Sequence, residues 1–171
     1  MNSYNEQRNA QVRKQILDAL ISMIKTQDYH SIGVSAIVET AHVGRASFYR
    51  NYTSKEDVLR QEAETVINEW SSDPQNSGSS SPVDFLESLF THFRENKELC
   101  MALYVAGMSD ILLDIIAKKI GIDPSMTNEE AYAKSSLAYM IFGWVNEWIK
   151  RGMEETGTEL KDMLLRNSAG G

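Results

Sequence analysis

The chain has 171 residues, a formal net charge of -7 and 42% hydrophobic residues. A chain of this length can bury a real core, and its apolar fraction is too high for a mainly disordered protein. The single cysteine, Cys100, excludes an internal disulfide framework and favours a reducing, cytoplasmic location. No apolar run is long enough to span a bilayer, and residues 1–8 lack a signal-peptide core, so no membrane partner is expected.

The net charge hides an asymmetry along the chain. Residues 1–60 carry a formal charge of +2, whereas the remaining 111 residues carry -9. Because an acidic surface repels phosphate, the amino-terminal segment is the candidate for contact with nucleic acid. We therefore expect a duplex to meet only this segment, with binding that weakens steeply as salt rises.

The apolar residues recur at three- and four-residue steps, which predicts an all-α protein. The expected helices cover about residues 6–26, 34–40, 45–52, 54–70, 82 onward, 97–107, 109–120, 129–151 and 158 to just before 168. Thr127 with Glu130, and Ser54 with Asp57, have the spacing of capping boxes at helix starts. The serine-rich segment at about 71–81 is predicted to be a flexible loop.

Residues 32–60 contain two short predicted helices joined by a four-residue turn, which is the pattern of a helix-turn-helix unit. In the second short helix, Phe48 and Tyr52 are four residues apart and can anchor one face in a core. The other face keeps polar and basic side chains, as a helix that enters a major groove requires.

The run from Val34 to Leu59 resembles the DNA-binding domain of TetR-family transcriptional regulators. The resemblance is carried by Phe48-Tyr49, by Tyr52 and by the Ser54-Lys55-Glu56 cap, and it covers about residues 8–60. It implies a homodimer in which an amino-terminal three-helix, helix-turn-helix domain precedes a helical-bundle regulatory and dimerisation domain. The expected domains are residues 1–53 and 54–171.

The sequence departs from the family pattern at two positions of the turn. His42 stands where the family usually has glycine, so the resemblance implies a positive φ at this position. Gly44 stands where a serine cap is common. These departures concern local capping rather than the fold. A second segment, Phe142–Ile149 followed by Gly152, resembles the carboxy-terminal domain frequent in members from low-GC Gram-positive bacteria.

The resemblance implies a set of DNA-binding residues in the helix-turn-helix unit. Arg45, Ala46 and Arg50 are expected near base edges, and Ser47, Tyr49, Asn51 and Lys55 mainly at phosphates, with Ser35 at the start of the supporting helix. Arginine can bond bidentately to guanine, and alanine can meet a thymine methyl group. Three cations before this unit either contact flanking phosphates or are solvated: Arg8, Arg13 and Lys14.

The acidic second domain offers two further candidate sites. A pocket for a small apolar or aromatic effector is expected at Met101, Tyr104, Met108, Tyr139, Met140 and Phe142, although residues of these types also fit an ordinary core. A dimer interface is expected at Leu137, Ile141, Trp144, Val145, Trp148, Leu160 and Leu164. The same stripe could instead close the domain internally.

These observations favour a transcriptional regulator that binds a palindromic double-stranded operator as a homodimer, with repression expected and a small-molecule effector. The alternative is an activator or co-regulator whose second domain docks a protein, which a fully packed regulatory core would favour. No catalytic motif is present, so an enzyme is not expected. No cofactor or metal is expected either, because His92 and Cys100 lack a third ligand at a suitable spacing.

Overall fold

The computed structural model describes residues 2–72 and 82–169, and every regular element within them is helical, which confirms the all-α prediction. Contacts divide the chain into two compact units, Met1–Glu62 and Ala63–Gly171. Residues 73–81, most of the expected flexible loop, lie outside the described part. No helix within that part is both long enough and apolar enough to cross a membrane.

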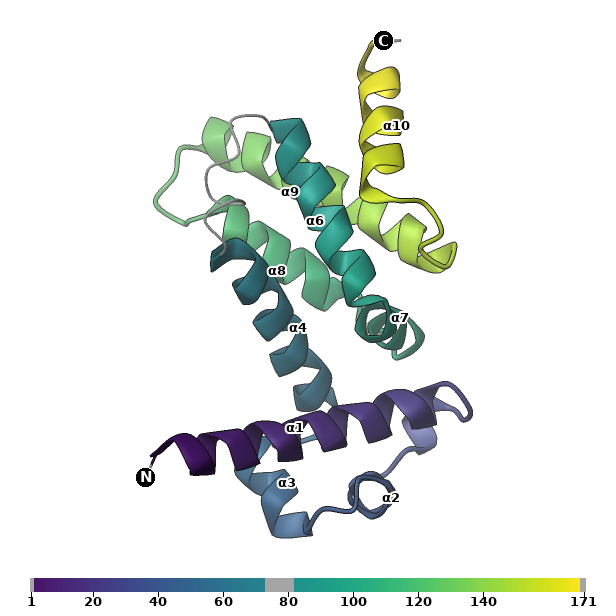
Figure 1. The fold of residues 1–171 in the computed structure, drawn as a ribbon. Coiled ribbons are helices and arrows are strands. Elements are labelled where there is room, and N and C mark those ends of the chain that lie inside the picture. The colour runs from purple at the N-terminus through teal and green to yellow at the C-terminus, as the bar shows by residue number, and fades with distance from the viewer. Residues whose placement is uncertain (1, 73–81, 170–171) are drawn as a thin grey trace. The chain divides into compact units, whose positions relative to one another are not determined.

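The first unit contains α1 (Asn2–Ile24), the short 3-10 helix η1 (Tyr29–Ser31), α2 (Val34–Thr40), α3 (Arg45–Asn51) and the beginning of α4 (Lys55–Ser72). Helix α1 packs against both α2 and α3 (Figure 1). The core is formed by side chains that are completely buried: Ile16, Leu20, Ile37, Phe48, Val58 and Leu59. Three short elements that could not be stable alone are thus held by tertiary packing.

The turn between α2 and α3 has the backbone expected from its sequence. His42 adopts a φ of 53°, in the left-handed region that the family resemblance implied for it. Gly44 caps α3 and Gly33 caps α2, each without a side-chain hydrogen bond. The orientation of α3 therefore depends on packing rather than on a strong cap.

The second unit contains the rest of α4 with α6 (Pro82–Glu95), α7 (Lys97–Val105), α8 (Asp110–Ile120), α9 (Asn128–Lys150) and α10 (Gly157–Ala169). Its core includes the fully buried side chains of Phe90, Leu103, Val145 and Ile149. Both bonds of the capping box predicted at Thr127 and Glu130 are present at the start of α9. Helix α8 ends at Gly121 in a left-handed conformation, with a φ of 73°.

Helix α10 lies alongside α6, and one glycine sets how closely they approach (Figure 1). A Cβ atom on Gly157 would lie 2.6 Å from the carbonyl oxygen of Glu87 and 2.5 Å from Thr91 Oγ1. Thr158 Oγ1 donates to Glu87 at 2.6 Å, and Lys161 pairs with the same carboxylate. The bond from Lys161 holds the pKa of Glu87 below its usual range.

Substituting alanine at two glycines should change stability in opposite directions. Gly157→Ala should lower the free energy of unfolding by about 1–3 kcal/mol, because the new methyl group meets the backbone of α6. Gly143→Ala, within α9, should raise the stability of the monomer by up to about 1 kcal/mol, because its Cβ meets nothing within 4 Å. Urea unfolding of each variant and of the parent protein measures both changes in the free energy of unfolding. A stable Gly157→Ala protein would contradict the close approach of α10 to α6.

Candidate nucleic-acid interface

Helix α3 has one buried face and one exposed face. Phe48 and Tyr52, which follows the helix, are 0% and 1% exposed, and their ring centroids are 5.9 Å apart. The opposite face is open, and five of the eight residues predicted to bind DNA are exposed there or at the start of α2: Ser35, Arg45, Ala46, Tyr49 and Arg50. Ser47, Asn51 and Lys55 are partly buried. The two aromatic anchors therefore determine which side chains face outward.

Three exposed side chains form a connected group at the start of α3. The Arg45 guanidinium donates to Ser35 Oγ at 3.1 Å and lies 3.5 Å from the Tyr49 hydroxyl. It also lies 5.7 Å from the centre of the Tyr49 ring, whose residue is half exposed. Arg45 is thus held in a defined direction, with no acidic partner in the described part of the chain. Its remaining N–H groups are available to an acceptor outside the protein.

A polar groove lies between the start of α1 and α3. Its volume is about 540 Å³, and it is lined by Asn5, Arg8, Asn9, Val12, Ser47, Arg50 and Asn51. None of these residues is acidic, and two are arginines. The groove adds Asn5 and Asn9 to the candidate DNA-binding residues. Arg8, Arg13 and Lys14 were expected either to contact flanking phosphates or to be solvated; of these three, Arg8 lines the groove.

The two asparagines follow a pattern that was available in the sequence. Asn5, Arg8, Asn9 and Val12 are separated by three, one and three residues, which places them on one face of a helix. The expected helix began at about residue 6, whereas α1 begins at Asn2. Asn5 therefore lies outside the predicted helix. Extending that helix by one turn toward the amino terminus places Asn5 on the same polar face as Arg8 and Asn9.

Lys55 is bound within the protein rather than directed outward. Its ammonium donates to the carbonyl oxygens of Tyr29, Ile32 and His30 at 2.6, 2.8 and 3.3 Å. It also lies 4.3 Å from the centre of the Tyr29 ring. An ammonium has three N–H donors, so a phosphate contact by Lys55 would have to replace one of these bonds. The geometry gives Lys55 the role of holding the segment before α2 against α4.

Arg13 is also bound internally, in a network at the end of α3. It donates to Glu62 at 2.6 Å and lies over the Tyr52 ring, 5.1 Å from its centre. The Tyr52 hydroxyl donates to the same Glu62 carboxylate at 2.6 Å. Burial first, and then this bond, raise the pKa of Tyr52, so its hydroxyl stays protonated. The network joins α1, α3 and α4 within the first unit.

A second carboxylate secures the start of α4. Asp57 accepts the backbone N–H of Thr53 at 2.7 Å and a bond from Gln61 at 3.1 Å, while its own N–H donates to Ser54 at 3.2 Å. Partial burial alone would raise the pKa of Asp57, but these bonds outweigh burial and lower it. The sequence predicted a capping box between Ser54 and Asp57. The bond from the Asp57 N–H to Ser54 is present, but the Asp57 carboxylate accepts the N–H of Thr53 instead of the N–H of Ser54.

The six residues expected to form an effector pocket do not line the cavities described for the second unit. Tyr139 and Met140 are 64% and 46% exposed on α9, and Phe142 lies on the same helix. Met101 and Tyr104 lie on α7, and Met108 follows that helix. The cavities of this unit have other walls: one lies between α9 and α10, and one of about 20 Å³ lies among α4, α6, α8 and α9.

The residues expected at the dimer interface divide between the core and the surface. Ile141, Val145, Trp148 and Leu160 are each at most 4% exposed, so within one chain they close the domain internally. Trp144 and Leu164 are partly buried, and Leu137 is exposed. A partner could gain little by covering the buried four, because their surface is already removed from water.

The first unit provides the chemistry of nucleic-acid recognition. Seven residues of α-helix span roughly 10 Å, and a B-form major groove is wide enough to admit a helix. The guanidinium, amide and hydroxyl groups of its exposed face match phosphate oxygens and base edges. No group of three or more His, Cys, Asp or Glu residues suited to a metal ion occurs in the described part of the chain.

Residues 16–61 match the family model of bacterial regulatory proteins of the tetR family. This match covers about a quarter of the chain and assigns its helix-turn-helix domain to the TetR family. The matched segment contains α2, the turn and α3, so the helix-turn-helix unit of this regulator is the one expected from Phe48-Tyr49, Tyr52 and the Ser54 cap. Members of the family regulate transcription and are not enzymes, which agrees with the missing catalytic motifs.

Solved structures share the fold of this chain over nearly its whole length. Lin0861 from Listeria innocua has a TM-score of 0.77 at 15% identity, and the alignment covers 95% of this chain and 92% of the Lin0861 chain. A TetR transcriptional regulator from Streptococcus agalactiae has a TM-score of 0.62 at 18% identity, and the alignment covers 97% of this chain and 98% of that regulator. The dihydroxyacetone kinase operon activator DhaS has a TM-score of 0.56 at 19% identity, and the alignment covers 91% of this chain and 92% of the DhaS chain. No curated protein matches the sequence.

Replacing Lys55 should reduce the stability of this regulator. Lys55→Met should lower the free energy of unfolding by about 2–3 kcal/mol, because the charge-assisted bonds to carbonyl oxygens are lost. Lys14→Met is the matched control: Lys14 is exposed and pairs with Asp18 on the same helix, so its loss should cost no more than about 0.5 kcal/mol. Thermal or urea unfolding measures both. Equal effects would contradict the internal role of Lys55.

Proposed function

We propose that this chain is a transcriptional regulator whose α3 enters the major groove of a double-stranded operator. The observation that carries the proposal is the orientation of Arg45 by Ser35 and Tyr49 on an exposed, non-acidic helix face. Arg45, Ala46 and Arg50 read base edges, while Ser35, Ser47, Tyr49 and Asn51 contact the sugar-phosphate backbone. Lys55 takes the supporting role described above.

The groove between α1 and α3 extends this interface to the flanking backbone. Arg8 and Arg50 lie on its walls together with Asn5 and Asn9. Arginine and asparagine side chains are frequent donors to phosphate oxygens, and such contacts fix the register of a protein on the duplex. The sequence-independent part of the affinity therefore comes from α1 as well as from α3.

The regulator acts as a homodimer in this proposal. One recognition helix reads too few bases, whereas two helices about 34 Å apart read a palindrome. Helix α9 carries the surface for dimerisation: Tyr132, Leu137, Tyr139 and Met140 are between 42% and 70% exposed, and Gly143 is exposed on the same helix. Gly143 costs helix stability, and apart from its chain neighbours and the backbone of its own helix, no described residue lies within 4 Å of the position of its missing Cβ. It therefore suits the close approach of a second helix.

A small-molecule effector controls this dimer. The cavity between α9 and α10, of about 480 Å³, has the volume of a ligand site, and the exposed Gly143 on its wall belongs to the proposed dimer surface. Binding there shifts the population between two dimer arrangements and lowers operator affinity. The chain is then a repressor released by its effector, and it works in the cytoplasm, where the operator is.

A second candidate function is activation, with the second unit docking a protein. The packing among α4, α6, α8 and α9 favours it, because the space enclosed there is about 20 Å³ and admits little more than a water molecule. DhaS, which shares the fold, is named as an operon activator. In vitro transcription from the operator that this chain binds decides between repression and activation, because the added protein lowers the amount of transcript in the first case and raises it in the second.

Removing both arginines of α3 should abolish sequence-specific binding. Arg45→Ala with Arg50→Ala should reduce the preference for the selected operator over random duplex by about 100-fold or more, because each bidentate base contact contributes about 1–3 kcal/mol. Arg60→Ala, an exposed arginine on α4, should change the preference little. Duplexes selected from a random library, measured by gel shift at fixed salt, provide the test. An unchanged preference in the double variant would place recognition elsewhere.

A charge on the outer face of α9 should separate the protomers without unfolding them. Tyr139→Asp places a carboxylate in the proposed interface and should weaken dimerisation by about 30-fold or more, since a buried unpaired charge costs about 2–5 kcal/mol. Its exposure of 64% means that the monomer should stay folded. Lys118→Asp on α8 is the control. Sedimentation equilibrium measures the dissociation constant of the dimer, and a Tyr139→Asp dimer as tight as the parent would exclude this face.

A further inference from the structure

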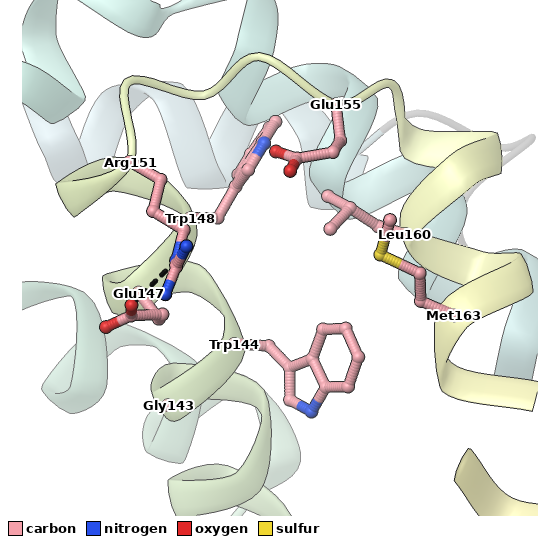
Figure 2. Close-up of a pocket in the computed structure, with 8 residues that line it drawn as sticks. All are labelled: Gly143, Trp144, Glu147, Trp148, Arg151, Glu155, Leu160 and Met163. Atoms are coloured by element: carbon pink, nitrogen blue, oxygen red, sulfur yellow. Dashed lines mark hydrogen bonds and ion pairs between the residues drawn. The ribbon is translucent and has the colours of Figure 1, made fainter. Parts of the chain in front are cut away.

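The walls of the cavity between α9 and α10 are largely apolar. Trp144 projects from α9, and Leu160 and Met163 project from α10 toward the same space (Figure 2). The cavity volume of about 480 Å³ is within the range of sites for small organic molecules. A ligand that fills it would bury its apolar body against an indole, a leucine and a methionine.

Two polar atoms at one end of this cavity have no hydrogen-bond partner among the residues that the structure describes. They are Trp148 Nε1 and Glu155 Oε2, and both are shielded from solvent. The Trp148 side chain is 3% exposed, and Figure 2 shows it and Glu155 pointing toward one another from α9 and from the segment before α10. Buried polar groups almost always have partners, and an unpaired donor or acceptor is costly. A ligand that reaches this end of the cavity would supply the missing bonds.

The charges around the cavity select the kind of ligand. Glu155 forms no ion pair within the described part of the chain, whereas Arg151, also on the wall, is bonded to Glu147 at 2.7 Å. The uncompensated carboxylate attracts a cation and repels an anion. The indole of Trp144 on the cavity wall adds to this preference, because an aromatic ring quadrupole attracts positive charge.

We propose that this cavity binds a small organic cation that carries N–H donors on an apolar or aromatic body. Its ammonium group bonds to Glu155, and its body lies between Trp144 and the α10 side chains Leu160 and Met163. An oxygen atom next to the ammonium would also satisfy Trp148 Nε1. This site rests on the proposed function, since it names the chemical class of the effector.

A small molecule fits this site better than a side chain of a second copy. The unpaired donor and acceptor lie at the buried end of the cavity, on atoms that are shielded from solvent. The exposed part of the proposed dimer surface instead lies along the outside of α9, at Tyr132, Tyr139 and Met140. A partner helix on that surface covers the outside of α9 and leaves the buried end to a ligand.

Three probes that share one skeleton test the charge preference: phenylbutylammonium, phenylbutanol and phenylbutyrate. Each is titrated into the full-length dimer by isothermal calorimetry. The ammonium ion should bind with one site per chain and at least about tenfold more tightly than the alcohol, with the carboxylate weakest. Glu155→Gln should remove most of this advantage. Glu154→Gln, at an adjacent carboxylate that is exposed and pairs with Lys97 at 3.7 Å, should leave it unchanged.

Several results would overturn the site: no binding of the ammonium ion, equal affinities for the three probes, or the same effect of both glutamine variants. Absence of binding to the dimer is also the result expected if a second copy fills the cavity. Operator binding of the same preparations is measured by gel shift. Intact operator binding without cation binding overturns only this site, whereas cation binding without operator binding overturns only the proposed function.

Discussion

The recognition surface depends on the burial of one face of α3. Phe48 and Tyr52 occupy the core of the first unit, and the Tyr52 hydroxyl bonds to Glu62, which also holds Arg13. A helix of seven residues has no stability of its own, so these contacts both form it and fix its rotation about its axis. Once that rotation is fixed, Arg45, Tyr49 and Arg50 can face only outward. The aromatic pair thus specifies the interface, although neither ring belongs to it.

Features that depend on near neighbours in the sequence could be predicted. The helix-turn-helix pattern, the positive φ that the family resemblance implied for His42 and the capping box at Thr127 involve residues that are at most a few positions apart. Their physical causes are steric limits on φ and the unsatisfied N–H groups of a helix start. Such causes act over one or two turns of chain, which is why a single sequence reveals them.

Features that depend on distant segments could not be predicted. The carbonyl acceptors of Lys55 lie 23 or more residues before it, and Gly157 is required by the backbone of α6, about 70 residues earlier. Helix α9 shows the same limit, because it is apolar on more than one side. Periodicity identified an apolar stripe, but only the packing of the neighbouring helices reveals that Val145 is inside and that Tyr139 is outside.

The internal bonds of Arg13 and Lys55 change the meaning of the charge on the first unit. Both cations add to the excess of positive charge in residues 1–60, yet their N–H groups are committed to Glu62 and to backbone carbonyls. In the proposed function, a duplex that approaches the protein meets chiefly the exposed guanidinium groups of α3 and the groove beside it. The proposal therefore implies that DNA releases fewer counterions on binding than the number of basic residues suggests. It also implies that a larger share of the affinity comes from shape and directed hydrogen bonds.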